Sequence, residues 1–347
     1  MSYPQKQNFF MPPEWHPHEC CWMQWPHEIP YKNSYKEIES WSHFDFEKGR
    51  ITWAKVAKAI SNFEKVNMII HPQDIEIAKK YLDSSINIYE FENDDCWARD
   101  SGATFLLDNQ NKLGGIDWEF NGWGKFSPHD SDNKIAKFMI DKSSAKYFKS
   151  SMILEGGSIH VNGTGTLITT EQCLLNKNRN PHLNKKEIED NLKKYLNIKK
   201  IIWLKHGTDE GTDGHVDNIA CFVDERKVLA LACKDKEDPF YDKINENLEI
   251  LKNSVCADGH QLEIIEMEMS YKRLIPDDDE PSSYINFYIA NNGIVMPSFD
   301  DKKADEHAQS VIKSLFPKRK IQAINGIDIS LGGGNMHCIT QQQPISI

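Results

Sequence analysis

Four stretches of the chain share one pattern, and this repetition limits the possible folds more than any other feature. They are "WARDSGATFLLD" (97–108), "EGGSIHVNGTGTLITTE" (155–171), "GHVDNIACFVDERKVLALAC" (214–233) and "YINFYIANNGIVMPSF" (284–299). In each, alternating or β-branched residues lie on both sides of a Gly, Asn or Asp turn, which is typical of a β-hairpin. A fifth pair is split between the chain ends, with strands predicted at 19–25 and 336–340.

Helical patterns separate these hairpins. Apolar residues at three- and four-residue intervals predict helices at about 51–64, 73–83, 132–141, 185–196, 240–253 and 302–315. Hairpin and helix together recur every ~55 to ~65 residues, which indicates a repeated supersecondary unit. No Gly/Ser linker divides the chain, so we expect one α/β domain over residues 1–347, closed by pairing of the last strand with the first.

The composition is that of a globular, acidic chain. With 347 residues, 39% of them hydrophobic, the chain can bury a sizeable core. No apolar run approaches the roughly 18 residues of a membrane span, and the N-terminus lacks a signal-peptide pattern, so we expect a cytoplasmic location and no membrane partner. The net charge of -11 argues against a nucleic-acid partner and would favour a small cationic substrate.

The cysteines form no disulfide framework. The eight are scattered along the chain without a C-x-x-C motif, so we expect reduced thiols that are mostly small buried core residues. They are Cys20, Cys21, Cys96, Cys173, Cys221, Cys233, Cys256 and Cys338. The thirteen histidines show no spacing typical of a zinc site, so no metal cofactor is expected.

The stretch "LGGGNMHCIT" (331–340) can be interpreted in two ways. Glycines such as Gly333 and Gly334 let backbone approach a ligand closely and let successive N–H groups point one way. Cys338 follows them by four residues, and a thiolate there would be a strong nucleophile. The alternative is a buried cysteine in an ordinary terminal strand.

Three further stretches concentrate groups that can do chemistry. In "GTDGHVDN" (211–218), His215 and Asp217 are two residues apart and would share one face of a strand, as a proton shuttle beside a charged anchor. "LEGGS" (154–158) places Glu155 at a strand start, with two glycines beside it. Each stretch could equally be structural, as a surface turn or a strand end.

"NDDCWARDSG" (93–102) gathers carboxylates around an aromatic ring. Asp94, Asp95 and Asp100 lie near Trp97 in sequence. A planar guanidinium binds to such a set, because carboxylates form hydrogen bonds in its plane while an aromatic face covers it. Taken together, the four stretches place an acid, a base, a nucleophile and guanidinium anchors at corresponding places in successive units.

Six stretches, in this order, resemble the agmatine deiminase branch of the guanidine-modifying superfamily. They are "MPPEWHPHECCWMQWP", "WARDSG", "LEGGS", "GTDGHVDN", "SYINFYIAN" and "LGGGNMHCITQQQP", and together they span nearly the whole chain. The resemblance implies a five-bladed pseudosymmetric α/β propeller of repeated ββαβ-type units, and catalysis without a metal or organic cofactor. The reaction it implies is hydrolysis of agmatine to N-carbamoylputrescine and ammonia through a covalent amidino-cysteine, a step of putrescine and polyamine biosynthesis.

The resemblance also implies a role for individual residues. The nucleophile falls on Cys338, the general acid/base on His215, the acidic residue that accompanies it on Glu155, and the guanidinium-binding carboxylates on Asp100 and Asp217. Asn286, in "SYINFY", falls on a position that lines the site, and Trp97 on an aromatic residue that covers the guanidinium.

The identity of the guanidine substrate is left open. A site for arginine should carry an extra Arg or Lys for its carboxylate, whereas "DWEFNGWGKF" (117–126) has only Lys125 and is otherwise aromatic and acidic. This favours a substrate with a cationic tail, such as agmatine. Candidates for its amine end are Trp118, Trp123, Asp94 and Asp95, although all four could be structural.

Other functions stay open from the sequence alone. Within the same chemistry these are a peptidylarginine or arginine deiminase and an amidinotransferase. From another class, the chain could be a catalytically silent propeller that binds guanidines or polyamines, although a pure binder has no need of the thiol of Cys338. A homodimer is possible.

Overall fold

The computed structural model describes residues 3–28, 43–124, 129–275 and 279–347. Within them the chain is α/β, and its strands form five separate sheets. One sheet has the strand order β16-β1-β2-β3, and the other four have the orders β4-β5-β6, β7-β8-β9, β10-β11-β12 and β13-β14-β15. None of the helices in this described part is long and apolar enough to cross a membrane.

The five sheets are built to one plan. In each, two strands pair antiparallel and a third strand joins in parallel. The three-stranded sheets contain β4 (Thr104–Leu107), β5 (Leu113–Glu119) and β6 (Lys146–Ile153); β7 (Ile159–Val161), β8 (Thr166–Thr170) and β9 (Lys200–Leu204); β10 (Ala220–Phe222), β11 (Lys227–Ala232) and β12 (Glu263–Glu268); and β13 (Tyr288–Ala290), β14 (Gly293–Ser298) and β15 (Lys320–Asn325). The antiparallel pairs confirm the predicted hairpins at 155–171, 214–233 and 284–299. The hairpin predicted within 97–108 is wrong, because this stretch holds the short helix α4 (Ala98–Ser101) and one strand, β4, whose antiparallel partner β5 begins only at Leu113.

A helix precedes the parallel strand of each sheet, because a parallel connection needs a crossover that returns the chain to the same edge. These helices are α2 (Phe46–Ser61), α5 (Ile135–Lys142), α7 (Lys185–Leu196), α8 (Tyr241–Lys252) and α9 (Lys302–Leu315). The first sheet gains an additional strand, β3 (Asn87–Glu90), after α3 (Ile75–Tyr81). The observed α7 and α9 have the predicted bounds, whereas α2 begins earlier because the Asp45 side chain accepts hydrogen bonds from the backbone N–H groups of Glu47 and Lys48.

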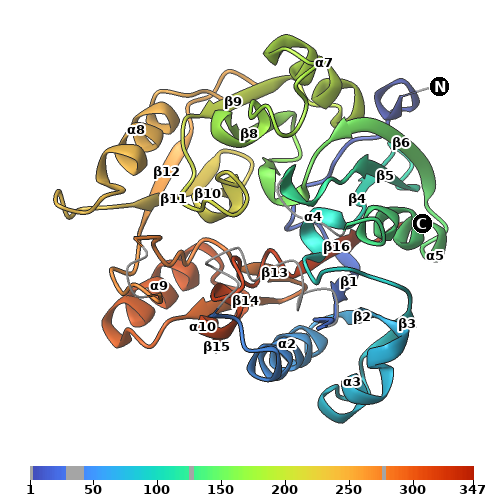
Figure 1. The fold of residues 1–347 in the computed structure, drawn as a ribbon. Helices are drawn as coiled ribbons and strands as arrows, with labels where there is room; N and C mark the ends of the chain where they lie inside the picture. The colour runs from blue at the N-terminus through green and yellow to red at the C-terminus, as the bar shows by residue number, and fades with distance from the viewer. Residues whose placement is uncertain (1–2, 29–42, 125–128, 276–278) are drawn as a thin grey trace.

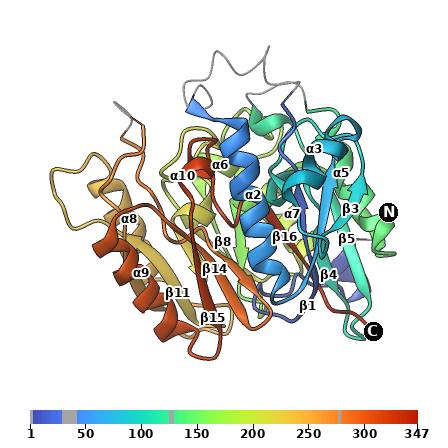
Figure 2. The same cartoon turned by 90° about the horizontal axis from the view of Figure 1, so that it is seen from below.

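The two chain ends pair as predicted. Strand β1 (His18–Gln24) lies antiparallel to β16 (Thr340–Pro344) and parallel to β2 (Lys65–Ile70). Both chain ends lie on the same side of the molecule (Figure 2). The prediction of a strand over 336–340 is wrong in its first four residues, because β16 begins only at Thr340. Cys338 lies in a turn closed by hydrogen bonds from Ile339 N to Asn335 O and from Thr340 N to His337 O.

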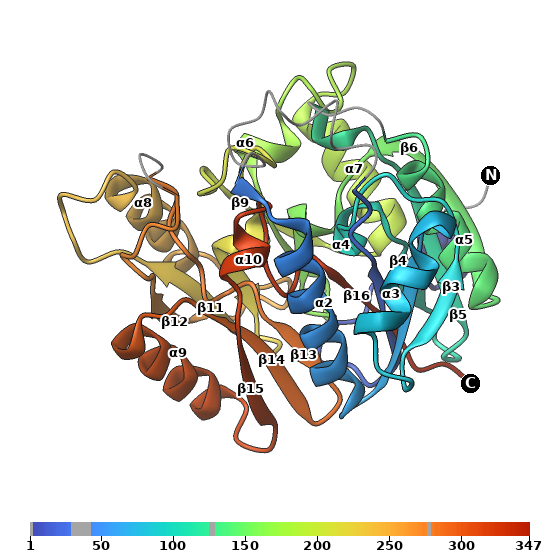
Figure 3. The same cartoon turned by 60° about the horizontal axis from the view of Figure 1, so that its bottom comes forward.

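The crossover helices lie outside the sheets. In Figure 1, α2, α5, α7, α8 and α9 lie at the periphery, whereas the short α4 (Ala98–Ser101) and β16 lie closer to the middle. Figure 3 shows α10 (Ile327–Ser330) beside α2, and the two helices are in contact. The apolar sides of the strands and helices form the buried core, in which all eight cysteines are free.

Short turns lead into the first strand of each sheet and meet near the middle of the molecule. Besides α4 they include the 3-10 turns η6 (Gly156–Ser158) and η7 (Val216–Asn218). Helix α4 contacts both η6 and β16, and η6 contacts η7. The remaining short elements are η1 (Pro4–Gln7), η3 (Pro72–Asp74), η4 (Gly122–Gly124), η5 (Asp132–Lys134) and α6 (Glu171–Leu174).

Candidate active site

Each of the five sheets contributes a candidate residue from the turn before its first strand. Asp100 precedes β4, Glu155 precedes β7, Asp217 precedes β10, Asn286 precedes β13 and Cys338 precedes β16. Because these turns meet at the middle of the molecule, residues that are far apart in sequence become neighbours. The repeated unit therefore explains why the predicted site residues recur at corresponding places.

Cys338 is buried among polar partners. Its side chain is 6% exposed, Asn286 Nδ2 donates to Sγ at 3.1 Å, and Sγ lies 3.4 Å from Asp217 Oδ2. Asn286 also accepts hydrogen bonds at Oδ1 from the backbone N–H groups of His337 and Cys338, at 3.0 and 3.3 Å. Asn286 thus fixes both the thiol and the turn that carries it.

Gly334 gives the thiol its room. A Cβ on Gly334 would lie 2.5 Å from the Trp97 ring and 3.0 Å from Cys338 Sγ, so no larger residue fits without displacement. Gly333 has φ +100°, a conformation that L side chains rarely adopt. Trp97 is buried and packs edge-on against Trp53, at 5.8 Å between ring centroids. The predicted neighbourhood of Cys338, Gly334 and Trp97 is therefore present.

Three side chains converge on Gly157, the second of the two glycines that follow Glu155 in "LEGGS". A Cβ there would lie 2.6 Å from His215 Nδ1 and 2.9 Å from both Asp100 Oδ1 and Asp217 Oδ2. The Gly157 N–H donates to Asp100 Oδ1 at 2.9 Å, and Trp123 Nε1 donates to Asp100 Oδ2 at 2.9 Å. Because residue 157 has no side chain, two carboxylates and an imidazole can approach its backbone closely.

The two carboxylates differ in proton affinity. Burial raises the pKa of Asp100, and the neighbouring charges of Asp217 and Glu155 act in the same direction. Burial also acts to raise the pKa of Asp217, but the hydrogen bond and charge of His337 outweigh it and lower that pKa. Asp217 is therefore the carboxylate that keeps its charge more readily.

His215 and Glu155 form a buried acid/base pair. The ring nitrogens Nδ1 and Nε2 of His215 lie 3.7 Å from Asp100 Oδ1 and 3.8 Å from Glu155 Oε2, and neither has a hydrogen-bond partner among the described residues. Burial acts to lower the pKa of His215, but Asp100, Cys173 and Glu155 together raise it well above its usual value. Such a ring can deliver a proton to a bound substrate.

Arg179 is a site residue that the sequence analysis missed. Its Nε lies 2.6 Å from Glu155 Oε1, and both side chains are fully buried. Burial acts to raise the pKa of Glu155, but Arg179 and His215 outweigh it and bring the pKa to about 2. Nothing in the local sequence marks Arg179, because it lies 24 residues beyond its partner.

The thiol of Cys338 is protonated in the empty site. Burial raises its pKa well above the ordinary value, and the charges of Asp217 and Asp100 raise it further. A cation placed between these carboxylates would neutralise their effect and favour the thiolate. The site is therefore arranged to activate its nucleophile when a cationic group is bound.

Three of the four candidates for the amine end make contacts within the fold, and their role in substrate binding stays a prediction. Asp94 Oδ2 accepts from Ser131 N at 2.6 Å, and Asp95 Oδ1 accepts from Cys96 N at 2.6 Å. Trp118 donates to Thr104 Oγ1 at 3.0 Å and packs in a hydrophobic core 5.1 Å from the Tyr195 ring. The fourth, Trp123, lies at the site, where it donates a hydrogen bond to the Asp100 carboxylate. Lys125 lies outside the described residues.

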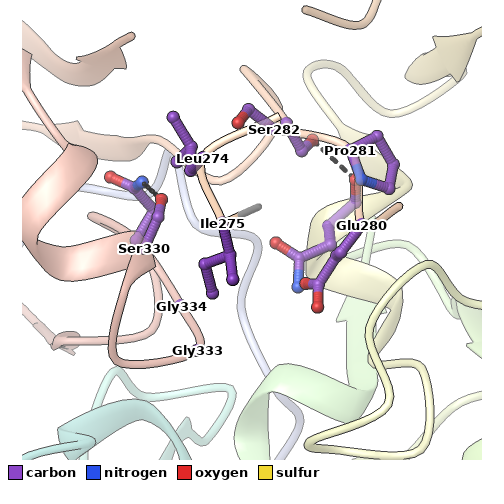
Figure 4. A pocket seen from close by; sticks show the side chains of 11 residues that line it. Leu274, Ile275, Glu280, Pro281, Ser282, Ser330, Gly333 and Gly334 are labelled. Atoms are coloured by element: carbon purple, nitrogen blue, oxygen red, sulfur yellow. Dashed lines mark hydrogen bonds between the residues drawn. The ribbon is translucent and has the colours of Figure 1, made fainter. Parts of the chain in front are cut away.

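A pocket lies beside Gly333 and Gly334 (Figure 4). It has a volume of about 60 Å³, and Gly333, Gly334, Asn218 and Glu280 contribute to its lining. Gly334 adjoins Cys338 as described above, and Asn218 Oδ1 accepts from the same Asn286 Nδ2 that contacts the thiol, at 3.0 Å. The pocket therefore adjoins the segment that carries the nucleophile, and Cys338 itself is not among the described residues that line it.

Two buried groups in the described part of the chain have donor atoms within 4.8 Å of one another, close enough to share a cation. They are Glu14, His160 and His337, and Glu155, Cys173 and His215. In the first, Glu14 and His337 already bind each other at 2.8 Å, and in the second Glu155 is paired with Arg179. The site geometry needs no metal to hold a guanidinium, and the absence of a metal cofactor stays a prediction.

Comparison with known proteins defines the class. Residues 10–344 match the model of the Porphyromonas-type peptidyl-arginine deiminase family. The chain belongs to this family, and it is a hydrolase that acts on C–N bonds of linear amidines.

Individual relatives are similar over their full length. The chain is 40% identical to an agmatine deiminase of Pseudomonas aeruginosa, covering 99% of this chain and 97% of the relative, and 39% identical to an agmatine deiminase of Medicago truncatula, covering 98% of each. The structure of the agmatine deiminase of Enterococcus faecalis matches with a TM-score of 0.90 at 33% identity, covering 100% and 99%. A Pseudomonas aeruginosa DDAH shares the fold alone, with a TM-score of 0.53 at 10% identity over 94% of this chain and 99% of that one.

Proposed function

We propose that this protein is an agmatine deiminase, which hydrolyses agmatine to N-carbamoylputrescine and ammonia. The observation that carries the proposal is the convergence of Asp100, Asp217 and His215 on the backbone of Gly157, with the Cys338 thiol 3.4 Å from Asp217. Carboxylates on this scale of separation bind a planar guanidinium through paired hydrogen bonds. The names of the full-length relatives in Pseudomonas and Medicago support agmatine as the substrate.

The first half-reaction begins with binding of the cation. Asp100 and Asp217 hold the guanidinium, and its positive charge lowers the pKa of the Cys338 thiol, which releases its proton to solvent. Sulfur then forms a bond to the guanidinium carbon and gives a tetrahedral adduct. His215 donates a proton to one terminal nitrogen, the C–N bond breaks, and ammonia leaves an amidino-cysteine.

The second half-reaction uses the same imidazole in the opposite sense. His215, now neutral, takes a proton from water, and the hydroxide adds to the amidino carbon. The C–S bond then breaks, the sulfur leaves with its electron pair and takes up the hydroxyl proton of the adduct, and the ureido product is released with the thiol regenerated. Glu155, kept ionised by Arg179, stabilises the imidazolium that forms in this step.

The lining of the pocket beside Gly333 and Gly334 favours agmatine over arginine compounds. Among the described residues that line it, none is Lys, Arg or His, and the charged one is Glu280. Among these described residues an arginine carboxylate would find no cationic partner. Arginine or peptidylarginine deimination and silent guanidine binding are therefore the alternatives that an experiment must separate.

The test is ammonia release from agmatine, free arginine and a peptide with C-terminal arginine at equal concentration. Intact-mass analysis of acid-quenched protein would detect the amidino group on Cys338. We expect turnover of agmatine alone, with the adduct. Turnover of an arginine compound would change the assigned substrate but not the assigned reaction. Binding of a guanidine without any ammonia release would support a catalytically silent binding protein.

We also propose that the five similar sheets are the blades of a pseudosymmetric α/β propeller formed by a single domain over residues 1–347. The common plan of the sheets and the pairing of β1 with β16 support this arrangement. Cytoplasmic location and a possible homodimer rest on the sequence alone. Light scattering coupled to gel filtration would determine the oligomeric state.

A further inference from the structure

A second cluster of charged side chains adjoins Asp217 and is centred on His337 and Glu14. His337 Nδ1 lies 2.9 Å from Asp217 Oδ2, and His337 Nε2 lies 2.8 Å from Glu14 Oε1. Arg99 Nη1 lies 3.2 Å from Glu14 Oε1, and His160 Nε2 lies 3.5 Å from Glu14 Oε2. All of these side chains are buried.

The cluster joins parts of the chain that are remote in sequence. Glu14 comes from the segment before β1, Arg99 from α4, His160 from β7, and His337 directly precedes Cys338. Arg99 Nε also donates to the backbone oxygen of His337, at 3.3 Å. A segment near the N-terminus is thereby connected to the turn that carries the nucleophile.

The geometry around His337 defines its protonation. A neutral imidazole has one N–H, whereas both ring nitrogens of His337 face carboxylate oxygens within hydrogen-bond distance. Only an imidazolium donates at both ends while both carboxylates keep their charge. Burial and Arg99 act to lower the pKa of His337, but Glu14 and Asp217 outweigh them and raise it.

His160 differs from His337 in this respect. Its Nδ1 accepts a hydrogen bond from the Phe222 N–H at 3.2 Å, so the neutral ring carries its hydrogen on Nε2, toward Glu14. His160 can therefore donate from Nε2 to Glu14 as a neutral ring. The titratable and charged groups that face His337 are Glu14, Arg99, His160, Asp217, Cys221 and Cys338.

We propose that His337 and Glu14 are positioning residues: the His337 imidazolium, held by Glu14, keeps Asp217 a carboxylate in the empty site, so that the guanidinium meets a charge already in place. Asp217 Oδ2 is then occupied by His337 and the thiol, while its buried Oδ1 has no partner among the described residues. That oxygen is left for the substrate. The assignment rests on the proposed function for the nature of the substrate.

The first test needs no substrate. Nitrogen-15 NMR of the protein labelled at histidine distinguishes a doubly protonated ring from either neutral tautomer, and the His337→Gln spectrum identifies the signal. We expect imidazolium at pH 7 that persists well above the usual histidine pKa. A neutral His337 ring at pH 7 would overturn the proposal, whether or not agmatine is the substrate.

The second test counts protons. Agmatine binding to the Cys338→Ser protein is measured by calorimetry in two buffers of different ionisation enthalpy. In the double variant with His337→Gln, Asp217 should bind a proton before agmatine is added. Agmatine binding must then displace this proton, so up to about one more proton should be released per site than in Cys338→Ser alone. Affinity at pH 7 should fall about tenfold or more.

Two matched variants separate charge from packing. In His337→Asn the amide, like that of Gln, can donate a hydrogen bond toward Asp217 but carries no charge, so the proton count and the affinity should change as in His337→Gln although the side chain is shorter. His160→Gln contacts Glu14 but not Asp217, and it should leave the proton count unchanged. An unchanged count and affinity in His337→Gln would refute the assignment, whereas failure of the Cys338→Ser parent to bind agmatine would count against the proposed substrate and leave the NMR result to decide.

Discussion

Arg179 donates through Nε to Glu155 Oε1 across 2.6 Å, and both side chains are fully buried. The guanidinium also reaches Asp213 Oδ2 at 2.6 Å and the backbone oxygen of Thr212 at 2.9 Å. Arg179 therefore connects Glu155 to the turn that leads into His215. The Arg179 guanidinium therefore keeps Glu155 ionised and holds in place the turn that leads into His215.

Loss of this cation should destabilise the fold. Arg179→Met leaves Glu155 as an unpaired buried carboxylate, and breaking such a pair typically costs about 3 to 5 kcal/mol of unfolding free energy. Urea denaturation measures the change. In the double variant with Glu155→Gln the uncompensated charge is gone, so the double variant should be more stable than Arg179→Met alone. Equal stability of the two proteins would show that the pair carries no such energy.

The same pair predicts acid sensitivity. The pKa of Glu155 falls from its ordinary 4.5 to about 2 in the folded protein, so the folded state binds fewer protons than the unfolded state between these values. Its contribution is fully present above about pH 4.5 and is lost as the pH falls toward 2. We expect the difference in Tm between wild type and Glu155→Gln to shrink over this range, and a constant difference would contradict the assigned shift.

The space at Gly157 should be intolerant of a methyl group. In Gly157→Ala the new Cβ would lie 2.6 Å from His215 Nδ1, so the imidazole or the carboxylates must move. Displacement of about 1 Å can cost about a hundredfold in rate, and we expect at least that loss in kcat/KM for agmatine. Gly211→Ala is the control, because nothing lies within 4 Å of its Cβ. If both variants kept full activity, Gly157 would not border the reacting groups.

Removal of a negative charge should make the thiol more reactive while stopping catalysis. Asp217 lies 3.4 Å from Cys338 Sγ and contributes to its raised pKa. In Asp217→Asn that pKa falls, and each unit gives about tenfold more thiolate at neutral pH. Iodoacetamide labelling of Cys338, followed by intact mass, should therefore be faster in the variant than in wild type. Slower labelling would mean that Asp217 stabilises the thiolate instead.

The indole of Trp123 should affect the acid limb of the pH profile. Trp123→Phe keeps an aromatic ring but removes the 2.9 Å hydrogen bond to Asp100 Oδ2, so the pKa of Asp100 rises further. A hydrogen bond to a charged group is worth about 1.5 to 3 kcal/mol, so kcat/KM should fall about tenfold or more. The loss should be greatest at low pH, and the acid limb should move to higher pH. An unmoved limb would exclude this role.

Much of the architecture was accessible from the sequence. Three of the four hairpins, the bounds of α7 and α9, and the pairing of the chain ends follow from periodicity and turn residues, because these depend on neighbours in the chain. The motif residues Asp100, Asp217, Asn286 and Cys338 were also found, since each stands in a short stretch with a recognisable composition. Their meeting at one place follows from the repeated unit.

Other features depended on contacts that no local pattern contains. Asp94 and Asp95 were candidates for substrate binding because carboxylates gather there, yet their oxygens satisfy backbone N–H groups of nearby turns. Trp118 was a candidate through its aromatic ring, which instead fills a core beside Tyr195. A residue type gives its possible interactions, but the direction of the side chain decides between them.

The sequence by itself determined the repeated α/β units, the order of the hairpins and helices, and which residue types stand before each first strand. Only the tertiary structure decided the charges at the site: it brings Arg179 to Glu155, and Glu14 and His337 to Asp217. Coulomb interactions and burial depend on distance in space, which folding sets between residues far apart in the chain. The sequence therefore predicts which groups can react, and the packed fold decides which of them carry a proton.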